Sequence, residues 1–231
     1  FVFYTSHILE REIKEGVETT IQQNVALAMD TVELFDEDNE DNAKLYMHIL
    51  KEALGNIRAT SQTIKTENDD ALELVSDKMG VLNNNHEISD KIKKLTNGGI
   101  PTIFAKSGNE FAAVSTSLLL DDGSRALGML NKTIYPKMMN KETYVGALNI
   151  FGRNYMRVYE PVIQNGEVVA VLFIGYDFTE GLEDLQKTMA QMKLGERGYF
   201  SIFNTKTNVY DIHPKLAGKA PEGQLKDVVD D

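Results

Sequence analysis

Arginine and tyrosine alternate in the stretch FGRNYMRVYEP, residues Phe151–Pro161. The alternating residues are Arg153, Tyr155, Arg157 and Tyr159. In an extended strand every second side chain lies on the same side of the sheet, so two guanidinium groups and two phenol groups are expected on one face. A guanidinium group binds a carboxylate through two parallel hydrogen bonds, and a phenol hydroxyl adds a further donor. The pattern indicates a face that can bind an anion.

Two interpretations of this strand stay open from its residues alone. One is a solvated edge strand whose arginines stack on the tyrosine rings. The other is a half-enclosed pocket, because the opposite side is not a strong core face either. That side carries Asn154, Met156, Val158 and Glu160. Buried arginines need partners, and with Glu160 on the other face a bound anion would supply one.

The neighbouring segments favour a place inside an antiparallel sheet. The turn QNGE, Gln164–Glu167, predicts a tight hairpin. It leads into VVAVLFIGY, Val168–Tyr176, which is nearly all apolar and therefore predicts a central strand covered on both faces. Further strands or extended pieces are predicted at 100–105, 111–120, 125–130 and 142–150, with a short helix over about 132–139. Hairpin-length links between them indicate antiparallel pairing.

The N-terminal third is predicted to be helical. Apolar residues recur there at spacings of three and four: Ile13, Val17, Ile21, Val25, Ala28, Val32 and Phe35. A helix of about 30 residues would be roughly 45 Å long. Such a helix suits a stalk or a helical dimer seam better than a compact enzyme core.

Three shorter helices are expected next. The acidic stretch DEDNEDN, residues 36–42, predicts a turn, and it lacks the glycine that a calcium loop needs at its sixth position. A second helix then carries Leu45, Ile49, Ala53 and Ile57 on one face, and a third carries Leu72, Val75, Met79 and Leu82. A fourth carries Ile88, Ile92 and Leu95 and stops at Asn97-Gly98-Gly99.

The order of elements predicts an α+β fold, because runs of helix precede runs of strand. After the central sheet, a connecting helix from Phe178 is followed by the start of a second unit. The predicted domains are residues 1–66, a helical segment; 67–194, the sheet with its connecting helix; and 195–231, the beginning of a second module. Asp177 comes between the central strand and the connecting helix, where it is expected to cap the helix.

Composition narrows the function further. The 231 residues carry a net charge of −11, which argues against nucleic acid as a partner, and there is no cysteine for thiolate zinc sites or disulfides. We find no nucleophile, phosphate-loop or metalloprotease motif, and we expect neither a catalytic residue, nor a metal, nor a cofactor. No run of about 18 apolar residues occurs. The first four residues, FVFY, are either the end of a membrane helix or a frayed terminus.

Three segments together resemble tandem Cache sensor domains, in which a type-3 module precedes a type-2 module. They are KIKKLTNGGIPTIFAKSGNEFAAVSTSL with DDGSRALG, then ETYVGALNIFGRNYMRVYEPVIQNGEVVAVLFIGYDF, and KLGERGYFSIFNTKTNVYDIHPKLAGK. The resemblance implies a PAS-like module with a five- to six-stranded antiparallel sheet and a long N-terminal helix. The start of a second Cache module would follow it.

The resemblance also implies which residues bind a ligand. Arg157 and Tyr159, in MRVYEP, lie where related citrate-sensing modules carry basic ligand contacts before a proline. The other candidates are Tyr155, Tyr144, Arg125, Arg153 and Thr116. A tyrosine rather than a lysine two residues before Pro161 favours a small monocarboxylate over a tricarboxylate. His213, in the His-Pro element, is expected to form a turn.

The function implied is that of the extracytoplasmic sensor domain of a bacterial methyl-accepting chemotaxis receptor. It would bind a small carboxylate or amino acid, form a homodimer through its N-terminal helix, and be anchored in the cell inner membrane by helices outside this chain. The alternatives are the sensor domain of a histidine kinase or of a cyclic-nucleotide signalling protein, and a protein-interaction module without a small ligand.

Overall fold

A computed structural model describes residues 2–67, 69–194, 198–199, 201–204, 209–213, 215–216 and 218–220. The chain packs as two compact units. One comprises residues 37–179, and the other comprises 1–36 together with 180–231. The domain boundaries after residues 66 and 194 stay a prediction. The division into units shows that residues 37–66 pack with the sheet and not with residues 1–36.

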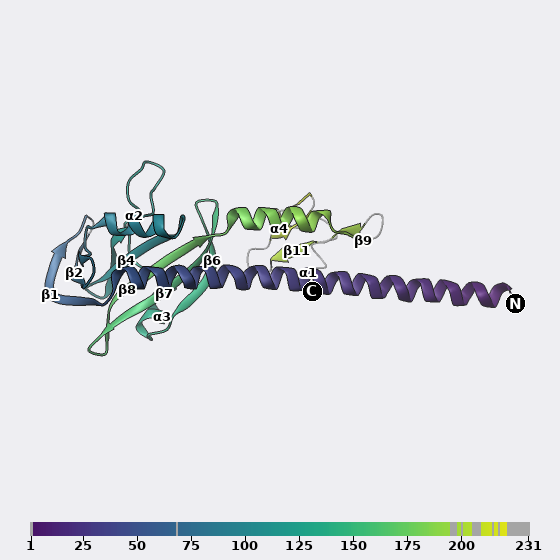
Figure 1. The fold of residues 1–231 in the computed structure, drawn as a ribbon, viewed down its shortest axis with the longest axis horizontal. Coiled ribbons are helices and arrows are strands. Elements are labelled where there is room, and N and C mark those ends of the chain that lie inside the picture. Colours follow the sequence, from purple (N-terminus) through teal and green to yellow (C-terminus); the bar gives the residue numbers. More distant parts are fainter. Residues whose placement is uncertain are drawn as a thin grey trace. The chain divides into compact units, whose positions relative to one another are not determined.

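The larger unit is built on a five-stranded antiparallel sheet (Figure 1), as the sequence predicted. Its strands are β4 (Ile100–Ser107), β5 (Glu110–Thr116), β6 (Tyr144–Ile150), β7 (Arg153–Gln164) and β8 (Glu167–Asp177). Their order across the sheet is β5-β4-β8-β7-β6. The nearly all-apolar strand β8 is therefore central, and the arginine–tyrosine strand β7 lies next to it.

Both turns that flank β7 are two-residue hairpins. Phe151 and Gly152 have φ of 50° and 80°, and Asn165 and Gly166 have φ of 54° and 82°. Two successive residues with positive φ match the twist of a hairpin, which explains the glycine at the second position of each turn. Strand β7 accordingly begins at Arg153. Its pairing with β8 contains one irregularity, between Val162 and Ile163.

Helix α1 (Val2–Leu54) is continuous, so the turn predicted at 36–42 is wrong. The acidic residues there remain helical because Lys44 forms ion pairs with Glu40 at 3.1 Å and with Asp41 at 3.6 Å, one turn away. Burial of the next apolar face adds to this. That face consists of Ala43, Met47, Leu50 and Leu54, whereas Leu45, on the predicted face, is 52% exposed.

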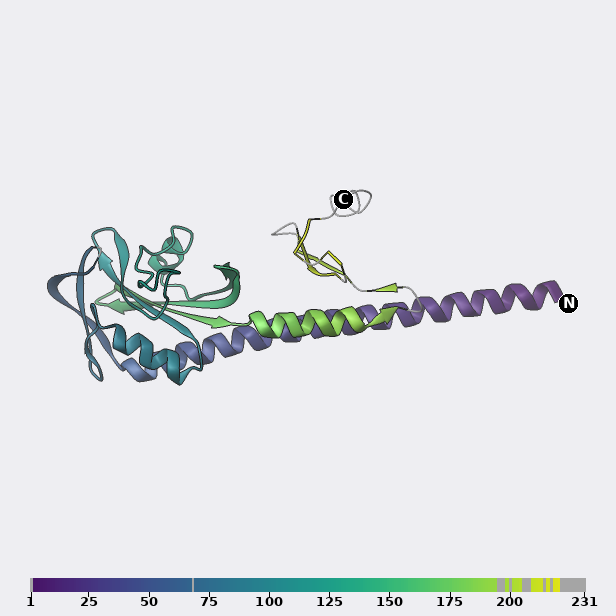
Figure 2. The ribbon, with the colours of Figure 1, turned by 90° about the horizontal axis from the view of Figure 1, so that it is seen from above.

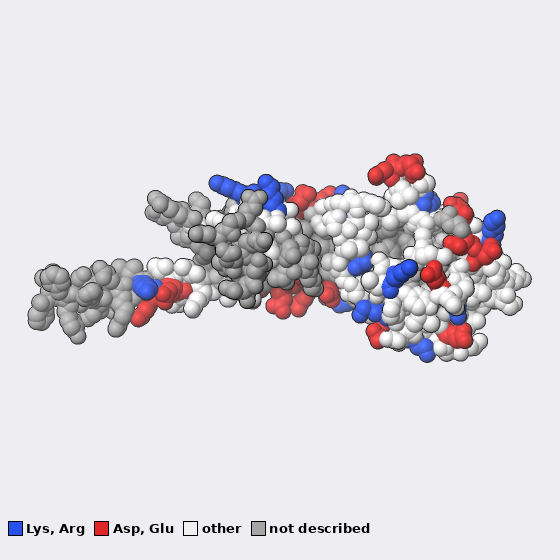
Figure 3. Space-filling model, turned by 180° about the vertical axis from the view of Figure 1, so that it is seen from behind, with Lys and Arg blue, Asp and Glu red and all other residues white. Residues whose placement is uncertain are grey.

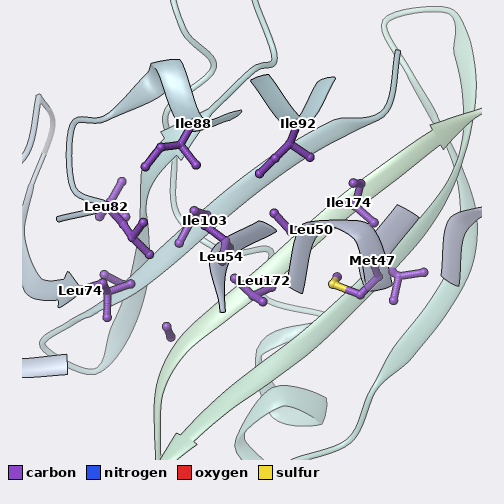
Figure 4. Close-up of a cluster of buried hydrophobic side chains, with 14 of the residues drawn as sticks. Met47, Leu50, Leu54, Leu74, Leu82, Ile88, Ile92, Ile103, Leu172 and Ile174 are labelled. Carbon is purple, nitrogen blue, oxygen red and sulfur yellow. The ribbon is translucent and has the colours of Figure 1, made fainter. Parts of the chain in front are cut away.

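One side of the sheet packs on α1 and α2. Met47, Leu50 and Leu54 of α1 contact a cluster that includes Ile103, Leu172 and Ile174 of the sheet (Figure 4). Helix α2 (His86–Leu95) adds Ile88 and Ile92, and it ends as predicted, with Asn97 and Gly98 in the positive-φ region. Lys51 of α1 forms an ion pair with Glu160 of β7 at 2.7 Å.

Residues 70–76 and 80–81 are strands joined by a turn, so the third predicted helix is wrong. Strand β2 (Asp70–Ser76) pairs with β1 (Ile57–Lys65) on one side and with β3 (Gly80–Val81) on the other, in a three-stranded sheet. The Gln164 side chain helps to hold this sheet, since its amide accepts a hydrogen bond from the Ala59 N–H at 2.8 Å and donates one to the Ala59 carbonyl at 3.1 Å. Tertiary pairing has overridden the helical spacing of Leu72 and Val75.

The end of α1 depends on Gly55. Its φ of 67° is in the left-handed region, and the next residue, Asn56, donates its backbone N–H to the Asp77 carboxylate at 3.0 Å. A Cβ on Gly55 would overlap that carboxylate. We therefore expect Gly55→Ala to lower the free energy of unfolding by about 2–3 kcal/mol, the sum of a left-handed alanine and a displaced carboxylate.

Gly80→Ala is the matched control for Gly55→Ala. Gly80 has a similar φ of 71°, but a Cβ there would meet no atom within 4 Å. It should cost only about 1 kcal/mol, the backbone part of the effect. Urea unfolding followed by circular dichroism measures both, and equal losses would contradict the role given to Asp77.

The other side of the sheet is covered by the chain between β5 and β6. We call residues 117–139 the covering segment; its last part is α3 (Tyr135–Met139). Leu130, Ile134 and Met138 of this segment are buried against Tyr155, Tyr159, Val171 and Phe173 of the sheet. The sheet is therefore enclosed on both faces.

In the other unit, α4 (Thr179–Gln191) lies along α1 (Figure 2), where Met189 and Leu185 pack with Ala28 and Val32. Short strands follow: β9 (Lys193–Leu194), β10 (Gly198–Tyr199), β11 (Ile202–Asn204) and β12 (Val209–Ile212). The end of the chain, 221–231, lies outside the described residues. His213 forms a turn as expected, since its Nδ1 accepts the N–H groups of Lys215 and Leu216 at 3.0 Å.

Helix α1 has 53 residues, but neither it nor another helix of the described part is apolar enough, over the length required, to cross a membrane.

Candidate functional site

Arg157 lies between two glycines in the sheet. It pairs with Gly175 of β8 on one side and with Gly146 of β6 on the other. Neither neighbour has a side chain, and aromatic side chains lie over both glycines instead, with Phe173 and Tyr155 each 3.4 Å from the position of a Cβ on Gly175. A Cβ added to Gly146 would come within 2.8 Å of Cζ of Tyr144, whose ring therefore lies over this glycine.

Next to Arg157, a row of residues paired across neighbouring strands begins with aromatic side chains and ends with two threonines. Tyr144 of β6 pairs with Tyr159 of β7, which pairs with Phe173 of β8. Ring centroids are 6.2 Å apart for Tyr144 and Tyr159 and 4.7 Å apart for Tyr159 and Phe173. The row continues through Thr102 to Thr116, whose hydroxyl oxygens are 2.7 Å apart. Tyr144, Tyr159 and Phe173 form an aromatic wall beside Arg157, and the two threonines lie farther along the row, on β4 and β5.

Burial decides between the two interpretations of the alternating strand. Arg157 and Tyr159 are each 7% exposed and Tyr155 is 6% exposed, so β7 is not a solvated edge strand. The opposite face also differs from the expectation, because Met156 and Val158 are buried in the main core cluster. The alternating residues thus occupy an enclosed face, with the exception of Arg153.

Two hydrogen bonds of the Arg157 guanidinium go to backbone carbonyls. Its Nε donates to the Gly146 carbonyl at 3.2 Å, and Nη2 donates to the Ala147 carbonyl at 3.5 Å. The rings of Tyr144 and Tyr159 lie 5.7 and 5.9 Å from its central carbon, which is within cation–π distance. Among the residues that the structure describes, no carboxylate forms an ion pair with Arg157. A buried charge in this state is costly unless an anion joins it.

The electrostatic surroundings of Arg157 are polar but not acidic. Burial raises the pKa of the Tyr159 hydroxyl, and the adjacent Arg157 opposes this rise without reversing it, so the phenol stays a neutral donor. Lys137 of α3 lies over the Tyr144 ring, with Nζ 5.4 Å from the centroid. A second cation therefore lies close to the same aromatic wall.

Arg153 and Tyr155 belong to a second group at the end of β7. Arg153 is half exposed and forms an ion pair with Asp177 of β8. Burial raises the pKa of Tyr155, and Asp177 adds to this rise. Burial alone would raise the pKa of Asp177, but hydrogen bonds from Arg153 and Thr179 lower it. Asp177 also accepts the Thr179 N–H at 3.0 Å at the start of α4, which confirms its predicted capping role.

Arg125 and Thr116 form a third group, at the end of β5. The two terminal nitrogens of Arg125 each donate to one oxygen of Asp90 at 2.7 Å, and Nη1 also donates to the Thr116 carbonyl at 3.1 Å. A hydrogen bond from Arg125 lowers the pKa of Asp90. Like Arg153, Arg125 is already neutralised by a carboxylate of its own chain.

Of the seven candidates, the structure brings Arg157, Tyr159 and Tyr144 together. Lys137, Gly146 and Gly175 also contribute to this site and were not predicted. The signal for Lys137 was weak, because it is one of several exposed lysines. The glycines were visible in the sequence, but their position opposite Arg157 depends on strand register.

A family model described as the Cache 3/Cache 2 fusion domain matches residues 6–228. Among solved structures, the sensory domain of the Campylobacter jejuni chemoreceptor Tlp3 with isoleucine bound is 13% identical, with a TM-score of 0.40, 80% of this chain covered and 66% of that chain. The Tlp3 ligand-binding domain with L-valine is 14% identical, with a TM-score of 0.37 and coverages of 72% and 60%.

The periplasmic domain of RsbU from Chlamydia trachomatis is 16% identical, with a TM-score of 0.34 and coverages of 71% and 59%. The chain thus spans less than two thirds of the length of each of these structures. No curated protein matched in a sequence search.

Proposed function

The chain belongs to the Cache 3/Cache 2 fusion family, and we propose that it is the extracytoplasmic sensor domain of a bacterial chemoreceptor. In this proposal it binds a small organic acid and passes the signal across the membrane. Catalysis is not part of the role. The observation that supports ligand binding most strongly is the enclosed Arg157 guanidinium between two glycines, which has no carboxylate partner among the described residues.

The ion pairs already formed on this face favour an anionic ligand over a zwitterionic one. Arg153 is paired with Asp177, and Arg125 is paired with Asp90. Of the three arginines, Arg157 alone lacks such a partner among the residues described, so one carboxylate would neutralise its buried charge, while Lys137 is exposed to solvent at the rim. An amino acid would also bring an ammonium group, and its natural acceptor, Asp177, is engaged by Arg153. A small monocarboxylate is therefore the first choice, with an amino acid second.

In the bound state, Arg157 would hold the ligand carboxylate through two donors, and the Tyr159 hydroxyl would add a third. The rings of Tyr144 and Tyr159 would contact an apolar ligand stem. We propose Tyr155, Arg153, Arg125 and Thr116 as further members of the site, each of which already has partners within the protein. The same binding role would serve a receptor whose output is a histidine kinase or a cyclic-nucleotide enzyme.

We propose a homodimer through α1, anchored by membrane helices outside this chain. In support, Val17, Ile21 and Val25, spaced four apart, are each about half exposed on α1. Apolar residues at this spacing form one stripe on a helix. The net charge of −11 argues against a nucleic-acid partner. On the face drawn in Figure 3, the described acidic and basic side chains are interspersed rather than gathered in one broad basic area.

A ligand-free interaction module is the second candidate. It is favoured by the close aromatic packing of Tyr144, Tyr159 and Phe173 beside Arg157. An open surface hollow of about 590 Å³ does occur in the fold, but it is lined in part by Lys93 and Asn97 and does not include Arg157. This position also favours the ligand-free module. In that case the tyrosine rings and the carbonyls of Gly146 and Ala147 would be the partners of the guanidinium.

Thermal unfolding of the wild-type chain with a panel of small acids separates the two candidates. The panel holds monocarboxylates, dicarboxylates and neutral amino acids, with the matching amides as controls. We expect at least one monocarboxylate to stabilise the chain by about 2.7 kcal/mol at a hundredfold excess over its Kd, and its amide to have no effect. A uniform lack of stabilisation across the panel would favour the ligand-free module.

A further inference from the structure

The covering segment is fastened to the rest of the fold at two places. Its second half is held by burial, since Leu130, Ile134 and Met138 pack against the sheet. Residues 128–130, at its middle, follow the edge of β5 as a further extended piece. There Ala113 donates its N–H to the Gly128 carbonyl at 2.9 Å, and Leu130 donates to the Phe111 carbonyl at 2.8 Å.

Between these backbone bonds and the end of β5, the segment forms a hairpin with an exposed tip. Leu119 and Arg125 pair across it, and Ser124 donates its N–H to the Asp122 carboxylate at 2.9 Å. The tip residues 121–124 are exposed. The side chain that leaves this hairpin to bind elsewhere is Arg125, which reaches Asp90 of α2 with both terminal nitrogens at 2.7 Å.

This ion pair has the geometry of a strong contact. Two parallel hydrogen bonds fix the direction of the guanidinium as well as its distance, and such pairs are the exception among surface ion pairs, most of which contribute little. Arg125 is one quarter exposed and Asp90 is 40% exposed. The same guanidinium holds the Thr116 carbonyl at 3.1 Å, so it ties α2, the end of β5 and the covering segment together.

Asp90 also connects this contact to the other side of the sheet. It lies on α2, and its neighbours Ile88 and Ile92 on that helix pack in the cluster that contains Met47 and Leu50 of α1. The chain that covers Arg157 is therefore joined by one ion pair to a helix that packs against α1.

We propose that the Asp90–Arg125 pair is a latch that keeps the covering segment closed over the Arg157 face, so that Asp90 is a positioning residue for the proposed ligand site. This inference rests on the proposed function only for the statement that the Arg157 face binds a ligand. The latch itself is a property of the ligand-free chain. Opening the pair frees the hairpin and loosens residues 126–139, while the sheet stays folded.

Hydrogen exchange of the ligand-free chain tests this latch through Asp90→Asn, Arg125→Gln and the double variant. We expect each single variant to lower protection in residues 126–139 about three- to tenfold, with strands β4 and β8 unchanged. The double variant should lose no more than either single variant, because both remove the same contact. Glu87→Gln, an exposed acid on the same helix, is the matched control and should change nothing.

The pH dependence of protection from exchange is a measurement that a general packing role of Asp90 would not change. The pKa of Asp90 is lowered chiefly by the hydrogen bond from Arg125, with smaller contributions from the nearby His86 and Lys93 of the same helix. The latch is therefore present above the usual aspartate pKa of about 4 and is lost as the pH falls through the lowered value. The difference between wild type and Asp90→Asn should therefore disappear in strongly acidic solution.

Unchanged protection in both single variants would overturn the latch, and so would losses that multiply in the double variant. Loss of protection throughout the sheet in both variants would overturn it too, because the effect would then not be local. The exchange readout needs no ligand. Failure of the acid panel in the wild type would instead remove the proposed function and leave the latch standing.

Discussion

Arg157→Gln is expected to abolish the stabilisation that a small carboxylate gives the wild-type chain. Removing one partner of a buried, hydrogen-bonded charge pair costs about 2–5 kcal/mol, which weakens binding by roughly 30-fold to several thousandfold. Glutamine keeps a donor near the position of the arginine Nε, but it lacks the two terminal nitrogens and carries no charge. The change in melting temperature with a saturating carboxylate measures the effect, and an undiminished response in this variant would contradict the assignment.

The same variant has a second expected result in the absence of ligand. Losing a structural arginine is usually destabilising, but the described neighbours of the buried Arg157 are backbone carbonyls and tyrosine side chains, which carry no negative charge. Removing it also removes the cost of keeping a charge from water. We therefore expect the ligand-free variant to melt no lower than the wild type.

Arg153→Gln and Arg58→Gln are the matched controls for Arg157→Gln. Arg153 lies on the same strand but is half exposed and paired with Asp177. Arg58 is exposed on β1. Both variants should keep most of the carboxylate response. If Arg153→Gln loses it and Arg157→Gln keeps it, the ligand binds at the end of the strand with Asp177, not between the two glycines.

Leu50→Ala is expected to have the largest effect on stability. Leu50 is fully buried between α1 and the sheet, and truncating such a leucine costs about 2–5 kcal/mol because a cavity remains. Leu45→Ala is the same change on the same helix at an exposed position. It should cost no more than about 0.5 kcal/mol. The two variants thus compare the observed and the predicted core face of α1.

Urea unfolding followed by far-ultraviolet circular dichroism measures both leucine variants. A large loss for Leu45→Ala with a small one for Leu50→Ala would reverse the result. It would then support the core face that helical spacing first suggested.

The sequence was sufficient to predict the central strand and the hairpin of the sheet, but not the register in which the strands pair. Apolar composition predicted that β8 is central, and the Asn-Gly turn predicted the hairpin with β7. Counting back from that turn, in which Gln164 pairs with Glu167, would place Arg157 opposite Ile174. The irregularity between Val162 and Ile163 moves the pairing by one residue, so that Arg157 faces Gly175 instead. A bulge of this kind has no strong local signal.

The partners of the charged residues were also beyond sequence reasoning. Arg153 pairs with Asp177, 24 residues away, and Arg125 pairs with Asp90, 35 residues away. The alternating pattern treated Arg153 and Arg157 as equivalent, but only folding shows that one of them meets a carboxylate. Long-range contacts decide which arginine is left to bind an anion.

The helical spacing of apolar residues led to a wrong prediction where tertiary contacts outweigh the local preference. Leu72, Val75 and Met79 have the spacing of a helix face, yet the segment pairs with β1. The acidic stretch around Asp38 resembles a turn in composition. It stays helical because it lies inside a helix whose later turns are buried against the sheet, and helix formation is cooperative.

The most direct test of the anion site is the NMR signal of the Arg157 side-chain Nε–H, assigned by comparison with Arg157→Gln. In the wild type this N–H donates to the Gly146 carbonyl at 3.2 Å. Titration with the stabilising monocarboxylate should move the signal along a saturating curve, while the matching amide leaves it in place. A signal that does not move, although the ligand stabilises the chain, would place the anion elsewhere and contradict the account.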